Sequence, residues 1–177
     1  MPVDIRLTYD DFCLLPSDGK RYEIIEGELF VTPAPNYYHQ IIVTRLTRHL
    51  SAFVEDNRLG LVFVSPFDVV FSQFDVVEPD ILYISKARSS VLTEKNVQGS
   101  PDLVIEVLSP STAKIDRTIK LKLYARFGGQ EYWIIDPEGP SAEIYRREND
   151  SLELVAKDTL TSPLFPGFSL PLQRLVE

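Results

Sequence analysis

Two carboxylates lie on apolar segments of the chain, where an ionised side chain is costly to bury. Glu106 stands between Ile105 and Val107 in the run PDLVIEVLS, and Asp80 follows Pro79 at the start of the segment EPDILYIS. A buried carboxylate needs a cation or hydrogen-bond donors to compensate its charge. Each is therefore a candidate metal ligand or acid–base group. The alternative for Glu106 is a structural ion pair with a basic residue nearby in the sequence.

Asp80 and Glu106 can act together only if their two strands pair. Asp102 shares a strand face with Glu106, but four residues of about 3.3 Å each separate the two by about 13 Å. One metal ion, whose oxygen ligands lie about 2.0–2.6 Å away, cannot bind both. We therefore interpret Asp102 as a strand-start residue and expect Asp80, on a neighbouring strand, to be the partner of Glu106.

The third candidate element is a basic segment, residues 112–127, which carries five basic residues and one acidic residue. Asp116, Lys120 and Tyr124 recur every four residues, as on one face of a helix. One interpretation is an exposed Asp116–Lys120 pair worth about 0.3–0.5 kcal/mol. The other is that Lys120 points over the end of the Glu106 strand, where its ammonium orients a water molecule or neutralises phosphate charge.

The elements that must position these residues follow from the hydrophobic pattern. Apolar residues at helical spacing predict a helix over 36–57, and 61–71 and 78–85 are typical of strands joined by a short hairpin link. The strand–helix–strand unit at 102–136 is expected to be parallel and right-handed. We predict an α/β fold with a mixed sheet.

Length and composition are typical of one globular domain. The chain has 177 residues, 44% hydrophobic and 25% charged. We expect a single domain over 1–177, with a core at about 36–136, an N-terminal helix and hairpin at 8–33, and a β-rich C-terminal decoration at 140–177. The single cysteine excludes a disulfide framework. Without an apolar run of about 18 residues or a signal peptide, we expect a cytoplasmic protein and no membrane partner.

Taken together, these segments resemble the Uma2 family of endonucleases, in the PD-(D/E)XK, or restriction-endonuclease-like, superfamily. The resemblance covers nearly the whole chain and rests on the ordered strings YEIIEGEL, EPDILYI, SPDLVIEVLSPST, DRTIKLKLYARFG and EYWIIDPE. It implies a restriction-endonuclease-like core, a four-stranded mixed sheet flanked by helices. It also implies Mg²⁺-dependent hydrolysis of phosphodiester bonds in DNA, with Mn²⁺ as a substitute.

The resemblance implies roles for individual residues. Asp80 matches the acid of the PD element and Glu106 the acid of the (D/E)XK element, but Leu108 stands where that pattern has its lysine. In this family the lysine is moved to the following helix, where Lys120 matches it. Lys122 is a competing candidate, about 200° around the helix from Lys120, so only one of the two should reach the site.

Two further residues are implied as auxiliaries. Glu26, in an acid-Gly turn, is expected to supply another carboxylate through a water, unless the hairpin is simply solvated. His39, at the start of a helix, is expected to contact the metal-bound water or a phosphate, unless it is only a polar surface residue. The resulting hypothesis places one Mg²⁺ between Asp80, Glu106 and the backbone carbonyl of Val107.

The expected partner is DNA, although the net charge of −8 predicts weak, salt-sensitive binding. Lys114 and Arg117 are candidate phosphate contacts, and a homodimer would bring two basic helices together. A competing hypothesis is a non-catalytic binding or regulatory protein of the same fold, which the departure at Leu108 favours. Another keeps the site but takes RNA or another phosphodiester.

Overall fold

The protein is described by a computed structural model that covers residues 5–156 and 158–177. Its main sheet has six strands within these residues, and β8 and β9 are its only parallel neighbours. The strands, in spatial order, are β11 (Ser151–Ala156), β10 (Ser141–Glu148), β9 (Glu131–Asp136), β8 (Leu103–Val107), β6 (Ile81–Ser85) and β3 (Gly60–Val64). The mixed α/β architecture predicted from the sequence is confirmed. The C-terminal strands β10 and β11 widen the implied four-stranded sheet.

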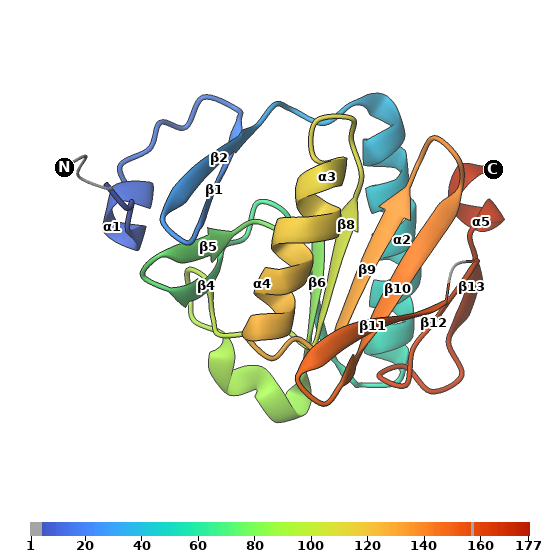
Figure 1. The fold of residues 1–177 in the computed structure, drawn as a ribbon. Helices are drawn as coiled ribbons and strands as arrows, with labels where there is room; N and C mark the ends of the chain where they lie inside the picture. Colours follow the sequence, from blue (N-terminus) through green and yellow to red (C-terminus); the bar gives the residue numbers. More distant parts are fainter. Residues whose placement is uncertain (1–4, 157) are drawn as a thin grey trace.

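A second sheet carries the N-terminal hairpin beside the main sheet (Figure 1). Its strands, in spatial order, are β2 (Glu28–Thr32), β1 (Arg21–Ile25), β5 (Asp75–Val77), β4 (Val69–Ser72) and β7 (Val97–Gln98). The short strands β12 (Thr159–Thr161) and β13 (Ser169–Pro171) pair with each other near the C-terminus. The first sheet residue after the N-terminal loop is Arg21, which reaches the site described below.

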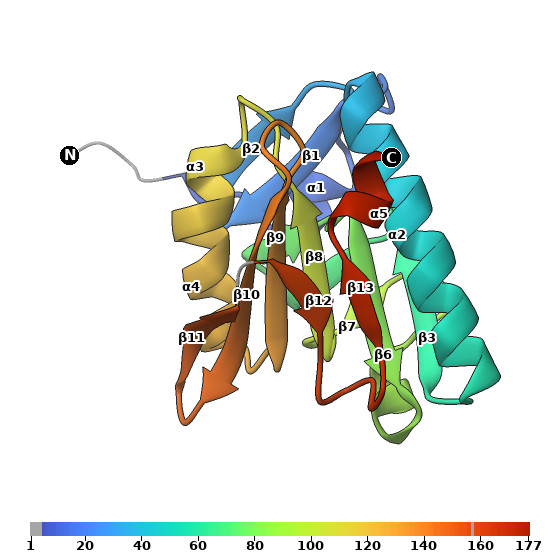
Figure 2. The same ribbon diagram turned by 90° about the vertical axis from the view of Figure 1, so that its right-hand side faces the viewer.

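Helices cover both faces of the main sheet (Figure 2). The long helix α2 (Tyr37–Asp56) begins at the Asn36 cap and buries Ile42, Leu46, Leu50 and Val54 against one face. The helices α3 (Ala113–Ile115) and α4 (Leu121–Arg126) cover the other face, joined by a π-helical turn at Asp116–Lys120. The short α1 (Tyr9–Phe12), the 3-10 segment η1 (Lys86–Val91) and α5 (Gln173–Val176) complete the helices.

Strand β8 is the centre of the core because both of its faces are covered. Leu103, Ile105 and Val107 pack on the α2 side, whereas Val104 and Leu108 pack on the α4 side. By the same alternation Glu106 faces the α3–α4 helices. The nearly continuous apolar run of this segment thus forms a strand buried on both faces, as the sequence predicts.

The predicted single strand over 61–71 is wrong. β3 pairs with β6 in the main sheet, whereas β4 pairs with β5 and β7 in the second sheet. Pro66 lies between them, and proline has no amide hydrogen to donate to a sheet. The tight hairpin therefore forms between β4 and β5, and the chain passes from one sheet to the other next to the start of β6.

No helix among the described residues is long and apolar enough to cross a membrane.

Candidate active site

The antiparallel pairing of β6 and β8 brings Asp80 and Glu106 together. Ile81 lies opposite Ile105, so Asp80, one residue before β6, lies beside the carboxyl end of β8. The backbone N–H of Val107 donates to Asp80 Oδ2 at 2.8 Å, and both carboxylate residues are only 2% exposed. The expected pairing of the two strands is confirmed.

Asp80 is held by two further side chains. Arg21 Nη2 lies 2.7 Å from Oδ1, and His39 Nε2 lies 3.0 Å from Oδ2. Burial by itself would raise the pKa of Asp80, but the hydrogen bond from His39 and the charge of Arg21 outweigh it and hold the pKa at about 2. Asp80 is therefore ionised at neutral pH.

Glu106 is paired with the lysine on the facing helix. Lys120 Nζ donates to Glu106 Oε1 at 2.8 Å, and the Tyr124 hydroxyl donates to the same oxygen at 3.2 Å. Both hydrogen bonds that Glu106 makes within the described residues reach Oε1, which leaves Oε2 available to the cavity beside it. Leu108, in contrast, is buried in the apolar cluster under α4.

Lys120 contacts two more carboxylates. Its Nζ lies 2.8 Å from Glu23 Oε2 on β1 and 3.5 Å from Asp116 Oδ1 on the π-helical turn. Burial favours a neutral amine, but the charges of Glu106, Glu23 and Asp116 raise the pKa of Lys120 well above its ordinary value. One buried ammonium is thus shared by three acidic side chains.

The acidic side chains exceed the cations that compensate them. Glu23, Asp80, Glu106 and Asp116 are opposed by the charges of Arg21 and Lys120, an excess of two negative charges when all four are ionised. Burial, followed by the charges of the neighbouring acids, raises the pKa of Glu106 to about 8 against the effect of Lys120. The pKa of Asp116 is raised by the same causes. The cluster can therefore accept further positive charge.

A cavity of about 230 Å³ opens onto this cluster. The segment 32–36 forms one wall, the loop 109–112 forms another, and Asp80, Glu106 and Lys120 lie between them. No group of three His, Cys, Asp or Glu side chains within residues 5–156 and 158–177 is arranged to hold a metal ion by itself. Any cation here would need water or substrate oxygens to complete its coordination.

The structure brings together only some of the residues selected from the sequence. Asp80, Glu106, Lys120, His39 and Val107 line the cavity.

The other candidates lie elsewhere. Glu26 is exposed in the β1–β2 turn and pairs with Arg126. Lys122 and Lys114 are exposed on the outer side of the α3–α4 helices. Arg117 is half-buried and donates to Glu143 at 2.7 Å.

Two members of the cluster were missed as site residues, and one of the two interpretations of Asp116 is excluded. Glu23 stands in the strand RYEII, and a charged residue inside an apolar strand is the signal that also singled out Glu106. Arg21 had no such signal. The exposed Asp116–Lys120 pair that the sequence allowed is in fact buried, because the π-helical turn faces the sheet.

Comparison with known proteins supports this architecture. A crystal structure of a protein from Anabaena variabilis, described as a "putative nuclease belonging to DUF820", superposes with a TM-score of 0.80 over 96% of this chain and 97% of that chain, at 23% identity. "Uncharacterized protein sll1609" of Synechocystis sp. is 26% identical over 133 residues, which span 74% of this chain and 75% of that protein. The family model Uma2, described as "Putative restriction endonuclease", matches residues 9–173. This match spans both sheets and every element that lines the cavity, and the chain therefore belongs to the Uma2 family.

Proposed function

We propose that this protein is a Mg²⁺-dependent endonuclease that hydrolyses phosphodiester bonds in DNA. The observation that carries the proposal is the arrangement of Asp80, Glu106 and Lys120 at one cavity, two acids on paired strands and a lysine from the facing helix. Family membership supports the reaction class.

The residues present fit a magnesium ion. Asp80 and Glu106 supply carboxylate oxygens, and the Val107 carbonyl is a third candidate donor of the same hard type. Mg²⁺ is commonly bound through one or two carboxylates while it keeps several waters or substrate phosphates. The absence of a three-side-chain cage in the described residues suits that mode. When all four acids are ionised, their excess of two negative charges matches one divalent cation.

When bound, the ion would lower the pKa of a coordinated water and polarise the phosphate. The protein's own groups have complementary tasks. His39 and Arg21 keep Asp80 ionised and oriented toward the cavity. Lys120 stays protonated among its carboxylates, so its ammonium can hold a water or stabilise the charge that develops on the phosphoryl oxygens. Lys120 takes the role of the lysine that the superfamily pattern has at position 108. The side chain of Leu108 itself is enclosed in apolar contacts.

The experiment combines metal binding with cleavage. Mg²⁺ binding is measured by calorimetry and nicking of supercoiled plasmid DNA by gel assay, for the wild type, Glu106→Gln and Asp80→Asn. Glu153→Gln, on exposed β11, is the matched control. We expect both cavity variants to lose binding and to slow nicking about 10²- to 10³-fold, and the control to behave as the wild type. Wild-type protein that neither binds Mg²⁺ nor cuts DNA with Mg²⁺ or Mn²⁺ would refute the proposal.

A second candidate is a non-catalytic binding protein of the same fold. The favouring observation is that Lys120 and Arg21 already pair with the two acids at 2.8 and 2.7 Å, as in a structural ion pair. Under this hypothesis calorimetry detects no metal binding in any variant. The cytoplasmic location and the homodimer remain predictions.

A further inference from the structure

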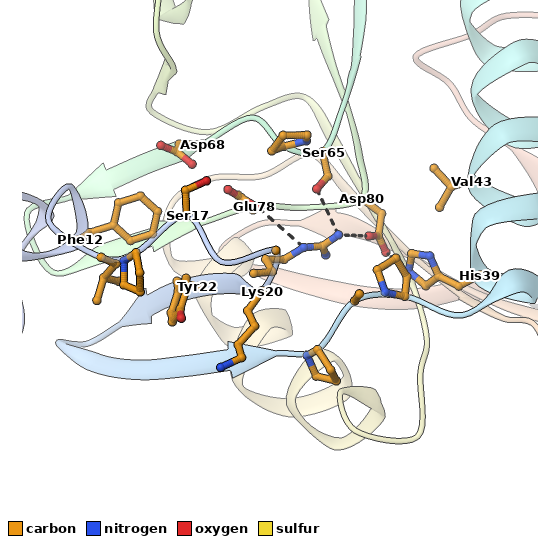
Figure 3. Close-up of a pocket in the computed structure, with 18 of the residues that line it drawn as sticks. Phe12, Ser17, Lys20, Tyr22, His39, Val43, Ser65, Asp68, Glu78 and Asp80 are labelled. Carbon is orange, nitrogen blue, oxygen red and sulfur yellow. Dashed lines mark hydrogen bonds and ion pairs between the residues drawn. The ribbon is translucent and has the colours of Figure 1, made fainter.

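A larger cavity of about 630 Å³ adjoins the active-site cavity, and most of the residues that line it have no part in the reaction proposed above. We call it the side cavity. Both cavities are lined by Arg21, His39 and Asp80 and by the segment 33–35, so these residues lie between them. The Arg21 guanidinium donates to Asp80 and Ser65 and lies 3.8 Å from Glu78 Oε2. Figure 3 shows Ser65, Glu78 and Asp80, with His39 beside Asp80. Adjoining cavities with a common wall can hold neighbouring parts of one ligand.

The side cavity offers flat apolar faces to a ligand. Phe12 and Tyr22 lie toward one end, far from His39 and Asp80 at the other (Figure 3). The rings of Pro33 and Pro66 add further apolar surface. Ligand sites typically combine apolar and aromatic walls with a few polar groups that fix orientation. The volume exceeds that of a single planar ring system, so a base with its sugar can enter.

The polar groups of the side cavity include a pair of acids. Asp68 and Glu78 are both half-buried and line the cavity, and Glu78 Oε2 lies 3.8 Å from Arg21 Nε. The two carboxyl groups thus present acceptor oxygens to the cavity. Carboxylates of this kind accept hydrogen bonds from amino groups at the edges of bases.

We propose that the side cavity binds one unpaired nucleobase of the substrate, with its exocyclic amino group donating to Asp68 and Glu78. The inference rests on the proposed function, because the phosphodiester of the same nucleotide segment would lie beyond the Arg21–Asp80 wall. A base that enters this cavity together with its sugar must leave the stack and its Watson–Crick partner. Enzymes that enclose a base bind single strands or pay to unstack and unpair it.

Two preferences follow. A single strand should bind more tightly than the same strand in a duplex by about 10- to 100-fold, the cost of extruding one base. Cytosine, which has an amino group, should be preferred to thymine, which has none.

The experiment measures binding without cleavage. Glu106→Gln protein in EDTA is titrated against fluorescent oligo-dC, oligo-dT and the oligo-dC·oligo-dG duplex, and anisotropy is recorded. Asp68→Asn and Glu78→Gln are then added in the same background. Asp150→Asn, at the exposed β10–β11 turn, is the matched control because it removes the same charge outside the cavity. Circular dichroism checks that each variant is folded.

The sign of the effect separates recognition from simple electrostatics. Removing a negative charge from an acidic protein should strengthen DNA binding in general, as expected for Asp150→Asn. We expect Asp68→Asn and Glu78→Gln to weaken binding of oligo-dC about 10-fold instead, and to reduce the preference over oligo-dT. Equal or tighter binding of oligo-dC by both variants would overturn the inference. So would equal affinity of the Glu106→Gln protein for oligo-dC, oligo-dT and duplex, a comparison that requires no change at Asp68 or Glu78.

The two proposals fail in different ways. A wild-type protein that cuts duplex DNA but shows no dependence on Asp68 or Glu78 refutes the base site alone. A protein that binds oligo-dC through these residues but cuts nothing refutes the endonuclease alone.

Discussion

Replacement of Glu106 by Gln is expected to stabilise the metal-free protein above neutral pH, although it removes a group that we propose for catalysis. Burial and the neighbouring acids raise the pKa of Glu106 from its ordinary 4.5 to about 8. Between these pH values the folded protein retains a proton that the unfolded chain releases. The unfolded state therefore gains relative stability as pH rises through this window.

The magnitude follows from the size of the shift. One pKa unit corresponds to about 1.4 kcal/mol, so the Glu106 carboxyl lowers the free energy of unfolding by about 3 to 4 kcal/mol between pH 5 and pH 8. Glutamine cannot ionise and retains hydrogen-bonding groups toward Lys120 and Tyr124. The variant should lack this part of the pH dependence and exceed the wild type in stability at pH 8.

Urea unfolding in EDTA, followed by circular dichroism at a series of pH values, measures the effect. Glu153→Gln is the control, because Glu153 is exposed on β11. Saturating Mg²⁺ should reduce the pH dependence of the free energy of unfolding of the wild type, since a bound cation favours the ionised carboxylate. Parallel pH curves for the wild type and Glu106→Gln would refute the reasoning, as would a variant less stable than the wild type at pH 8.

Three further outcomes are expected from the same cluster. Lys120→Met leaves the buried carboxylates without their shared cation, so it should lower the free energy of unfolding by about 3–5 kcal/mol at pH 8. The control Lys122→Met, at an exposed position, should change it by less than about 0.5 kcal/mol. Urea titrations measure both. Folding lowers the pKa of Asp80 from its ordinary 3.8 to about 2. Asp80 should therefore contribute about 2 kcal/mol to the free energy of unfolding, present above pH 3.8 and lost as pH falls to 2. The free energy of unfolding of Asp80→Asn, measured over the same acid range, should not show that loss. A variant that loses stability in acid as steeply as the wild type would contradict the prediction. Leu108→Lys restores the superfamily pattern but places an ammonium in an apolar cluster, so it should lower the thermal midpoint and fail to rescue cleavage by Lys120→Met.

The sequence alone determined the elements that carry the two acids. The apolar run around Glu106 required a strand covered on both faces, and the spacing of about 13 Å excluded Asp102 as its metal-site partner. In the structure Asp102 instead accepts from the Ser85 N–H at 2.8 Å, at the start of the strand. Local periodicity is sufficient for such conclusions because it depends on residues a few positions apart.

Tertiary structure decided which charges meet. Arg21 reaches Asp80 and Glu23 reaches Lys120 only because the N-terminal hairpin lies against the end of the main sheet. Glu26, in the same hairpin, is directed to Arg126 instead. Short-range patterns do not encode these pairings, because they depend on how two sheets and a helix pack.

The helix that follows β8 shows the effects of local periodicity and of tertiary packing together. Its periodicity placed Asp116 and Lys120 on one face and Lys122 on another. Whether that face met water or the Glu106 strand depended on the packing of Leu123 and Tyr124 against the sheet, which buries the lysine and commits its charge to the acids. Sequence thus determined which residues share a face, and the free energy of packing decided what that face contacts.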